Sequence, residues 1–174
     1  MAIRKKLAKL QGGKDAINIQ HAKGRLTLRE RINYILDKDS FQELGEVAGS
    51  PEFNAKGSLN NFIPANFILG FGKINKRSVV IGGEDFTLKG GSPNAAGLRK
   101  SIYTEDLAIN YKMPLIRLHE GGGGSVAGPS NNKNSSSGDP VFSKSRFKSV
   151  AETLKTIPVV SAALGPVAGL PAAR

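Results

Sequence analysis

The chain contains no cysteine, which excludes disulfides, thiolate zinc sites and cysteine nucleophiles. It also lacks any apolar run near the roughly 20 residues that a membrane-spanning helix needs. The first twenty residues lack the apolar core of a secretory signal. We therefore expect a protein of a reducing compartment, namely the cytoplasm, or the mitochondrial matrix if the source is eukaryotic.

Acidic residues are few, since 14 Asp and Glu face 25 Lys and Arg and leave a net charge of +11. Such a basic balance fits nucleic acid, an anionic membrane or a polyphosphate ligand. The densest basic cluster, Arg4 to Lys9, alternates with Leu7 and Leu10 and is typical of the solvated face of a short helix. The eight Phe and three Tyr do not form the basic stacking pattern of single-strand binders. We expect neither nucleic acid nor a membrane as a partner.

One globular domain is expected from 174 residues of which 39% are hydrophobic. Thr27 and Glu30 form a capping-box pattern before apolar residues at helical spacing, and this predicts a helix over residues 28–36. Residues 45–61 are rich in Gly, Ser and Asn without a period, so they predict a surface loop.

The rest of the chain alternates strands and helices. Apolar runs at 67–74 and 78–86 have hairpin spacing and predict two paired strands. The elements expected after them are a helix with Leu98, Ile102, Leu107 and Ile109 on its apolar face, a strand at 114–118, a polar flexible loop at 127–140, a helix at 143–156 and a strand at 158–164. This order predicts a layered α/β domain with helices packed on a sheet.

Two glycine loops, Gly121 to Gly124 and Gly165 to Gly169, each follow a short apolar strand. If these strands are parallel neighbours, two sets of backbone N–H groups converge beyond their ends, where layered α/β domains usually bind ligands. Such a pair can stabilise a developing oxyanion, and one donor of this kind is worth roughly 3 kcal/mol of barrier. A helix beginning near Leu170 would add the positive end of its dipole.

Other interpretations of these loops fail on spacing. Neither loop has the Gly-Lys-Ser/Thr of a P-loop or the G-x-G-x-x-G of a dinucleotide site, and Ser125 lacks the G-x-S-x-G context of a nucleophile. The two histidines, His21 and His119, are more typical of packing residues, with a catalytic role for His119 left open. The acidic pairs are expected to be solvated, and they are Glu84–Asp85 and Glu105–Asp106. Backbone donors therefore have to carry the chemistry.

Four blocks of the sequence resemble one family, in the same order. QHAKGRLTLRERINYILDKDSFQEL resembles the opening helix of the carboxyltransferase (beta) subunits of biotin-dependent acyl-CoA carboxylases, the propionyl-CoA and methylcrotonyl-CoA group. EDFTLKGGSPNAAGLRK resembles their DFT, GGS and lysine block. PLIRLHEGGGGSV and GPVAGLPA take the places of their two oxyanion loops.

The resemblance implies an α/β, crotonase-like (ββα superhelix) domain, incomplete at its C-terminal side, that binds an acyl-CoA and stabilises its thioester enolate. It implies catalytic backbone donors among Gly122, Gly123, Gly124, Ala168 and Gly169. It implies acyl-CoA contacts at Phe86, Gly90, Gly91, Ser92 and Lys100, the last of them to a CoA phosphate. The carboxyl group would arrive on biotin that a partner carries, and no metal is implied.

In domain terms, the resemblance assigns residues 1–44 to an N-terminal helical segment and 62–174 to the crotonase-like core, with the C-terminal biotin-binding domain absent. The implied partners are a biotin carboxylase or biotin carrier subunit and further copies of the full-length protein. We expect the isolated chain to be inactive. The loop GGGGSV, in place of the family's frequent GGAR, leaves the acyl preference open. An acyl-CoA decarboxylase of the same subunit family and a non-catalytic assembly fragment remain the alternatives.

Overall fold

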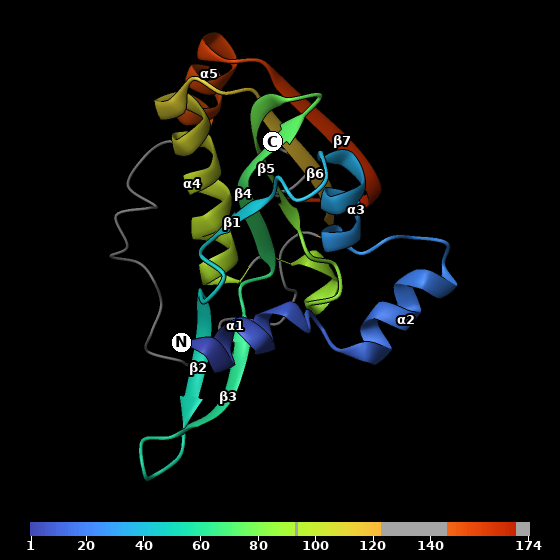
Figure 1. Cartoon of the computed structure of the whole chain (residues 1–174), viewed down its shortest axis with the longest axis vertical. Helices are drawn as coiled ribbons and strands as arrows, with labels where there is room; N and C mark the ends of the chain where they lie inside the picture. Colours follow the sequence, from blue (N-terminus) through green and yellow to red (C-terminus); the bar gives the residue numbers. More distant parts are fainter. Residues whose placement is uncertain (93, 123–145, 170–174) are drawn as a thin grey trace.

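The computed structural model describes residues 1–92, 94–122 and 146–169 of the chain. Its elements follow one another along the chain as Figure 1 shows. They are α1 (Ala2–Lys9), α2 (Lys14–Ala22), α3 (Leu28–Ile35), β1 (Gln42–Leu44), β2 (Gly49–Phe53), β3 (Leu59–Pro64), β4 (Phe67–Ile74), β5 (Arg77–Glu84), the 3₁₀ turn η1 (Lys89–Gly91), α4 (Ala95–Tyr111), β6 (Leu115–Gly121), α5 (Arg146–Thr156) and β7 (Val159–Val167).

A mixed sheet of five strands, in the order β1-β4-β5-β6-β7, forms the centre of the described structure. β1, β4 and β5 are antiparallel neighbours, whereas β5, β6 and β7 run parallel. Parallel neighbours need a crossover connection, and α4 lies in the one between β5 and β6. Helix α3 covers one face of the sheet and α4 covers the other (Figure 1). The predicted layered α/β architecture is confirmed.

The strands supply apolar side chains to both faces, because successive residues of a strand point to opposite sides. The buried cluster on the α3 face contains Leu28, Ile32, Leu36, Ile68, Val79, Ile81 and Leu118. The buried cluster on the α4 face contains Phe67, Leu69, Val80, Leu107, Ala108, Leu115 and Ile157. The sheet is therefore covered on both sides along β4, β5 and β6, whereas β7 at its edge is mostly exposed.

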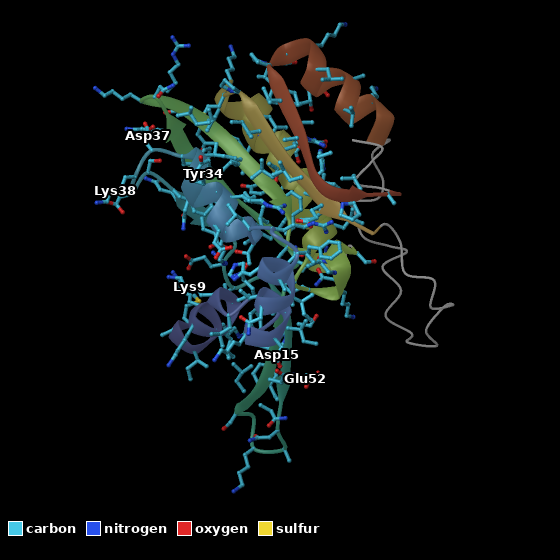
Figure 2. All side chains as sticks on the ribbon, turned by 90° about the vertical axis from the view of Figure 1, so that its right-hand side faces the viewer. Lys9, Asp15, Tyr34, Asp37, Lys38 and Glu52 are labelled. Carbon is cyan, nitrogen blue, oxygen red and sulfur yellow. The ribbon has the colours of Figure 1, made fainter. Side chains whose placement is uncertain are left out.

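The prediction of a loop at 45–61 is wrong, because the β-hairpin of β2 and β3 occupies most of this segment. The Asn54 side chain accepts hydrogen bonds from the backbone amides of Lys56 and Ser58, both at 3.0 Å, and these bonds shape the turn. The two strands, GSPEF and LNNFIP, are mostly polar and exposed, so they carry no apolar alternation that would predict them. The hairpin projects from the body of the molecule, with Glu52 on its outer part (Figure 2).

Helix α4 buries a different face from the one predicted. Leu107 is buried, but Leu98, Ile102 and Ile109 are only half-buried. The side chains that the helix buries are mainly polar or small, and they are Lys100, Ser101, Thr104, Glu105 and Ala108. Lys100 donates to the loop after β1 and Glu105 pairs with Arg117 of β6, whereas Ser101 and Thr104 donate to carbonyls of the helix itself. Periodicity of apolar residues does not reveal such partners.

The remaining predicted elements agree with the structure within a few residues. The hairpin strands are β4 and β5, the strand at 114–118 is β6, and the helix at 143–156 is α5 from Arg146. The strand at 158–164 is longer than expected and continues as β7 to Val167. The flexible loop at 127–140 and the helix expected near Leu170 lie outside the described residues. In the part of the chain that is described, every helix is too short or too polar to cross a bilayer.

Candidate active site

The ends of β6 and β7 meet at one edge of the sheet. Their parallel register pairs His119 with Ala163 and Gly121 with Val167. Just beyond it, the amide of Ala168 donates a hydrogen bond of 2.9 Å to the carbonyl of Gly121. The two predicted glycine loops therefore leave the sheet from adjacent positions, as parallel neighbouring strands require.

The Gly90-Gly91 turn packs directly against the first glycine loop. The carbonyl of Gly90 accepts a hydrogen bond of 2.9 Å from the amide of Gly122. A Cβ atom on Gly91 would lie 2.3 Å from the carbonyl oxygen of Glu120, and Gly91 has a φ of +70°. Only glycine allows both this close approach and this backbone conformation. The two glycines thus let a segment from before α4 reach the end of β6.

Phe86 and Ser92 flank this turn. The ring of Phe86 lies 3.9 Å from the position that a Cβ of Gly90 would take. The backbone carbonyl of Ser92 accepts a hydrogen bond from the side-chain amide of Asn66. Four of the five residues expected to contact acyl-CoA therefore surround one turn, and that turn touches the first glycine loop.

The hydrogen bonds narrow the choice of free backbone donors. The amides of Gly122 and Ala168 already donate to the carbonyls of Gly90 and Gly121. Within the described residues, the amide of Gly169 has no hydrogen-bond partner, and Gly169 has a φ of +63°. Gly123 and Gly124 lie outside the described residues.

Lys100, the fifth expected contact, does not lie with the other four. Its side chain is 8% exposed, and its Nζ donates to the carbonyl of Gly45 at 3.3 Å. Burial lowers the pKa of Lys100 to about 8, although the nearby carboxylates of Glu43 and Glu46 act to raise it. In the described structure Lys100 is therefore a buried partner of the loop after β1.

Lys100 lines a small cavity together with other charged residues and with apolar ones. Arg29, Asp85 and the two glutamates near the lysine contribute to its lining. Burial raises the pKa of the Asp85 carboxyl above its usual value, and hydrogen bonds from Thr87 oppose that shift. Arg29 is paired with Glu43 through two contacts of 2.6 and 3.1 Å.

The acidic pairs are not solvated as the sequence predicted. Glu84, Asp85 and Glu105 are buried. Glu105 forms an ion pair with Arg117 of β6, which stabilises a charge that would be costly to bury alone. Alternation failed as a guide here because both faces of the sheet are covered, so both residues at the end of β5 become buried.

His119 is a packing residue of the α4 face rather than an exposed strand end. It is buried, and its Nδ1 lies 3.4 Å from Oε2 of Glu84. The two atoms are not aligned for a hydrogen bond, and neither ring nitrogen has a hydrogen-bond partner among the described residues. His21, by contrast, is on the surface, where its Nε2 lies 3.0 Å from Glu30.

Glu120 was not singled out from the sequence, yet it lies at the centre of the site. It directly precedes the first glycine loop, is 2% exposed, and has its Oε2 2.5 Å from Nη1 of Arg31. One signal could have found it, since an acidic residue at the end of an apolar strand needs a buried cation. The chain has 25 Lys and Arg residues, and only the tertiary structure shows which of them pairs with Glu120.

Comparisons with known proteins give a consistent result. The family model described as the carboxyl transferase domain matches residues 19–172. The mitochondrial propionyl-CoA carboxylase beta chain of Homo sapiens is 35% identical over 125 residues, which are 71% of this chain and 23% of that protein. The biotin-dependent acetyl-/propionyl-coenzyme A carboxylase beta5 subunit of Mycobacterium tuberculosis is 37% identical over 114 residues, or 66% of this chain and 21% of the relative. The chain thus spans less than a quarter of the length of these relatives.

Solved structures agree with this result. Transcarboxylase 12S, determined as a hexamer with methylmalonyl-coenzyme A bound, has a TM-score of 0.62 and 28% identity, over 72% of this chain and 24% of that chain. A single-chain, multi-domain long-chain acyl-CoA carboxylase has a TM-score of 0.74 over 99% of this chain and 18% of its own. At 23% identity, the second comparison shows a common fold alone.

Proposed function

Because the chain belongs to the family of carboxyl transferase domains, which matches it over residues 19–172, we propose that it forms the acyl-CoA-binding part of a biotin-dependent carboxyltransferase. Its fold is the crotonase-like α/β fold of the carboxyltransferase structures that it resembles. In the proposed reaction the α-carbon of an acyl-CoA loses a proton and bonds to the carboxyl carbon supplied by carboxybiotin, while the biotin nitrogen gives up that carbon and takes a proton. In this reaction the chain binds the thioester and stabilises the negative charge that develops on the thioester oxygen.

One observation carries the proposal: the two glycine turns begin side by side, tied by the hydrogen bond from Ala168 to Gly121. Backbone amides that converge on a developing oxyanion lower a barrier without any side-chain acid or base. The amides of Gly122 and Ala168 are occupied, so these two residues shape the turns. We place the donors at the positions that follow, Gly123 or Gly124 in the first turn and Gly169 in the second.

We place the acyl-CoA against Phe86, Gly90, Gly91 and Ser92, because this turn touches the first glycine loop. The thioester can then reach the amides while the CoA runs past the turn. Lys100 does not belong to this contact surface, because its Nζ donates to the carbonyl of Gly45. We propose that it stabilises the loop after β1 instead.

Carboxybiotin is the second substrate in this proposal, carried by a biotin carrier subunit or domain. A donor set of backbone amides, without a nucleophile, fits a reaction in which the chain forms no covalent bond to the biotin. The partners we propose are a biotin carboxylase or carrier subunit and further copies of the full-length protein, in the cytoplasm or the mitochondrial matrix. This assembly would be needed for turnover.

The proposal is tested by ligand binding to the 174-residue chain. The probes are CoA and a CoA thioether that ends in a nitroalkyl group, whose nitronate anion resembles a thioester enolate. Converging amides should bind the nitronate at least about tenfold more tightly than CoA, which corresponds to roughly 1.4 kcal/mol. Calorimetry measures both affinities, and the NMR shift of the Gly169 amide reports whether that amide contacts the nitronate.

A glycine pair provides the matched control. Gly91→Ala should weaken binding of both probes about tenfold or more, because its Cβ would meet the Glu120 carbonyl at 2.3 Å. Gly57→Ala has the same kind of strain, with a φ of +75°, but no atom lies within 4 Å of its Cβ, so binding should not change. Equal affinities of the wild-type chain for CoA and the nitronate would contradict the proposed donors.

A further inference from the structure

One side chain, that of Arg31, contacts both strands that lead to the glycine turns. Its Nη1 lies 2.5 Å from Oε2 of Glu120, the last side chain of β6 before the first turn. Its Nη2 donates a hydrogen bond of 3.4 Å to the backbone carbonyl of Leu164 in β7. A single residue of α3 therefore connects the ends of β6 and β7.

The connection lies where the strands lose their regular pairing. His119 pairs with Ala163, and the next pair is Gly121 with Val167. Only Glu120 lies between these pairs on β6, whereas three residues, 164–166, lie between them on β7. A bulge of this kind leaves backbone groups outside the ladder, so another contact has to fix the relative position of the strand ends.

The pair is buried, so it tolerates little displacement. Glu120 is 2% exposed and Arg31 is 7% exposed. Separating two buried charges is strongly unfavourable, which makes the geometry of such a pair well defined. A Cβ on Gly165 would lie 2.5 Å from Oε1 of Glu120, so the carboxylate packs directly on the backbone of β7.

Two further side chains complete the surroundings of the carboxylate. Nη1 of Arg25 lies 3.5 Å from Oε1 of Glu120, and Nε2 of Gln20 donates to the same oxygen at 3.2 Å. Two guanidinium groups therefore face one carboxylate, and the cluster carries a net positive charge. A positive cluster at the ends of β6 and β7 favours an anion bound nearby, and the partial burial of the cluster limits screening by salt.

We propose that Arg31 and Glu120 are positioning residues, which fix the spacing of the two glycine turns across the bulge between β6 and β7. They contact no substrate and act through the backbone of the turns. The functional half of this inference rests on the carboxyltransferase function proposed above. The structural half, the fixed spacing of the turns, can be measured without any ligand.

The variant that tests it is Arg31→Gln, and the matched control is Arg29→Gln. Arg29 lies two positions earlier on the same helix. Its substitution removes an ion pair with Glu43 and leaves the contacts of Arg31 in place. In Arg31→Gln, hydrogen exchange of the Ala168 amide should become at least tenfold faster, because the strand ends separate more often. The ratio of affinities for the nitronate probe and for CoA should fall about tenfold. In Arg29→Gln both quantities should stay at their wild-type values.

A second variant separates positioning from the simple cost of an unpaired buried charge. The double variant Arg31→Gln, Glu120→Gln removes both fully buried charges of the pair and leaves only the partly exposed Arg25, so it should recover thermal stability. If the pair positions the turns, the double variant still shows fast exchange at Ala168 and a reduced affinity ratio. Recovery of all three quantities would overturn the proposal, and this variant also decides the matter if Arg31→Gln alone does not fold.

Failure of this inference can be distinguished from failure of the proposed function. A wild-type chain that prefers the nitronate, together with a folded Arg31→Gln variant of unchanged exchange and unchanged affinity ratio, would refute the positioning role alone. A wild-type chain without that preference would refute the proposed function, and the exchange rate of Ala168 would still decide whether Arg31 fixes the turns.

Discussion

Lys100 illustrates how far the surroundings of a single residue can differ from what its sequence neighbours suggest. It follows a glycine block in a strongly basic chain, and the family resemblance implied a contact with a CoA phosphate at this position. In the structure it is buried beside Gly45, and burial lowers its pKa to about 8 from a usual 10.5. The folded state therefore holds this proton less tightly than the unfolded chain does.

This difference predicts a pH dependence of stability. Between about pH 8 and the usual lysine value of 10.5, the unfolded chain keeps a proton that the folded chain has lost. The free energy of unfolding should therefore rise with pH across that window, by up to about 3 kcal/mol from this group. Below the window both states are protonated, and the full cost of burying the ammonium is present.

Lys100→Met should remove this rise, because methionine fills the space without a titrating group. Urea unfolding at several pH values between 7 and 10.5 measures how the free energy of unfolding changes with pH. Lys38→Met is the control, since Lys38 is exposed on the surface (Figure 2) and should leave the slope unchanged. A slope that is the same in Lys100→Met and in the wild type would show that another group is responsible.

Helix α3 is the element on which the site depends most, because it carries Arg31 to the ends of β6 and β7. Its first turn is closed by a capping box, in which Glu30 accepts from the Thr27 amide at 2.7 Å and Thr27 accepts from the Glu30 amide at 3.4 Å. Its inner side packs Leu28 and Ile32 on the sheet. Tyr34, on the outer side, is exposed (Figure 2).

Removal of the cap should weaken the helix and, with it, the position of Arg31. Thr27→Ala should lower the free energy of unfolding by about 1 kcal/mol, the usual cost of losing a threonine N-cap. Denaturant unfolding measures this change. Thr156→Ala, at the exposed end of α5, should change stability by less than about 0.5 kcal/mol. Equal effects of the two substitutions would mean that the cap contributes little.

At the scale of the whole molecule, the described sheet ends at β7, whose outer side chains are largely exposed. Val160 is 59% exposed and Leu164 is 38% exposed, next to the turn that holds Gly169. Backbone donors stabilise an oxyanion most strongly where water is excluded, and one side of the proposed site is open here. The curated relatives are about three times as long as this chain, so they have further chain that can cover this side.

We therefore predict that the isolated chain does not catalyse carboxyl transfer. With propionyl-CoA and carboxybiotin, the rate of methylmalonyl-CoA formation should equal that of a blank without protein, even where the nitronate probe binds. Mass spectrometry of the CoA products measures this. Product formed at a rate above the blank would mean that these residues suffice for catalysis.

The alternative function, an acyl-CoA decarboxylase, is distinguished in the assembled full-length protein. That protein would then consume methylmalonyl-CoA and would not form it.

The sequence by itself determined the four longer strands β4, β5, β6 and β7, the helices α3, α4 and α5, and the family. Local patterns specify these features, because apolar runs at 67–74 and 114–118, the Thr27 cap and the glycine positions have the same physical consequence in almost any context. It also indicated that two glycine loops would each follow a short apolar strand, whereas the parallel pairing of those strands came from the structure. The polar β2–β3 hairpin escaped prediction because its strands bury little and have no apolar period.

Only the tertiary structure decided which charges meet. Glu120 and Arg31 are 89 positions apart in the chain, and Gly90 reaches Gly122 only because α4 crosses over the sheet and returns beside it. Pairing of buried charges depends on three-dimensional distance and on exclusion of water, and neither is a property of a local stretch of residues. For the same reason the sequence indicated the two turns, whereas the contacts that hold them together became visible only in the fold.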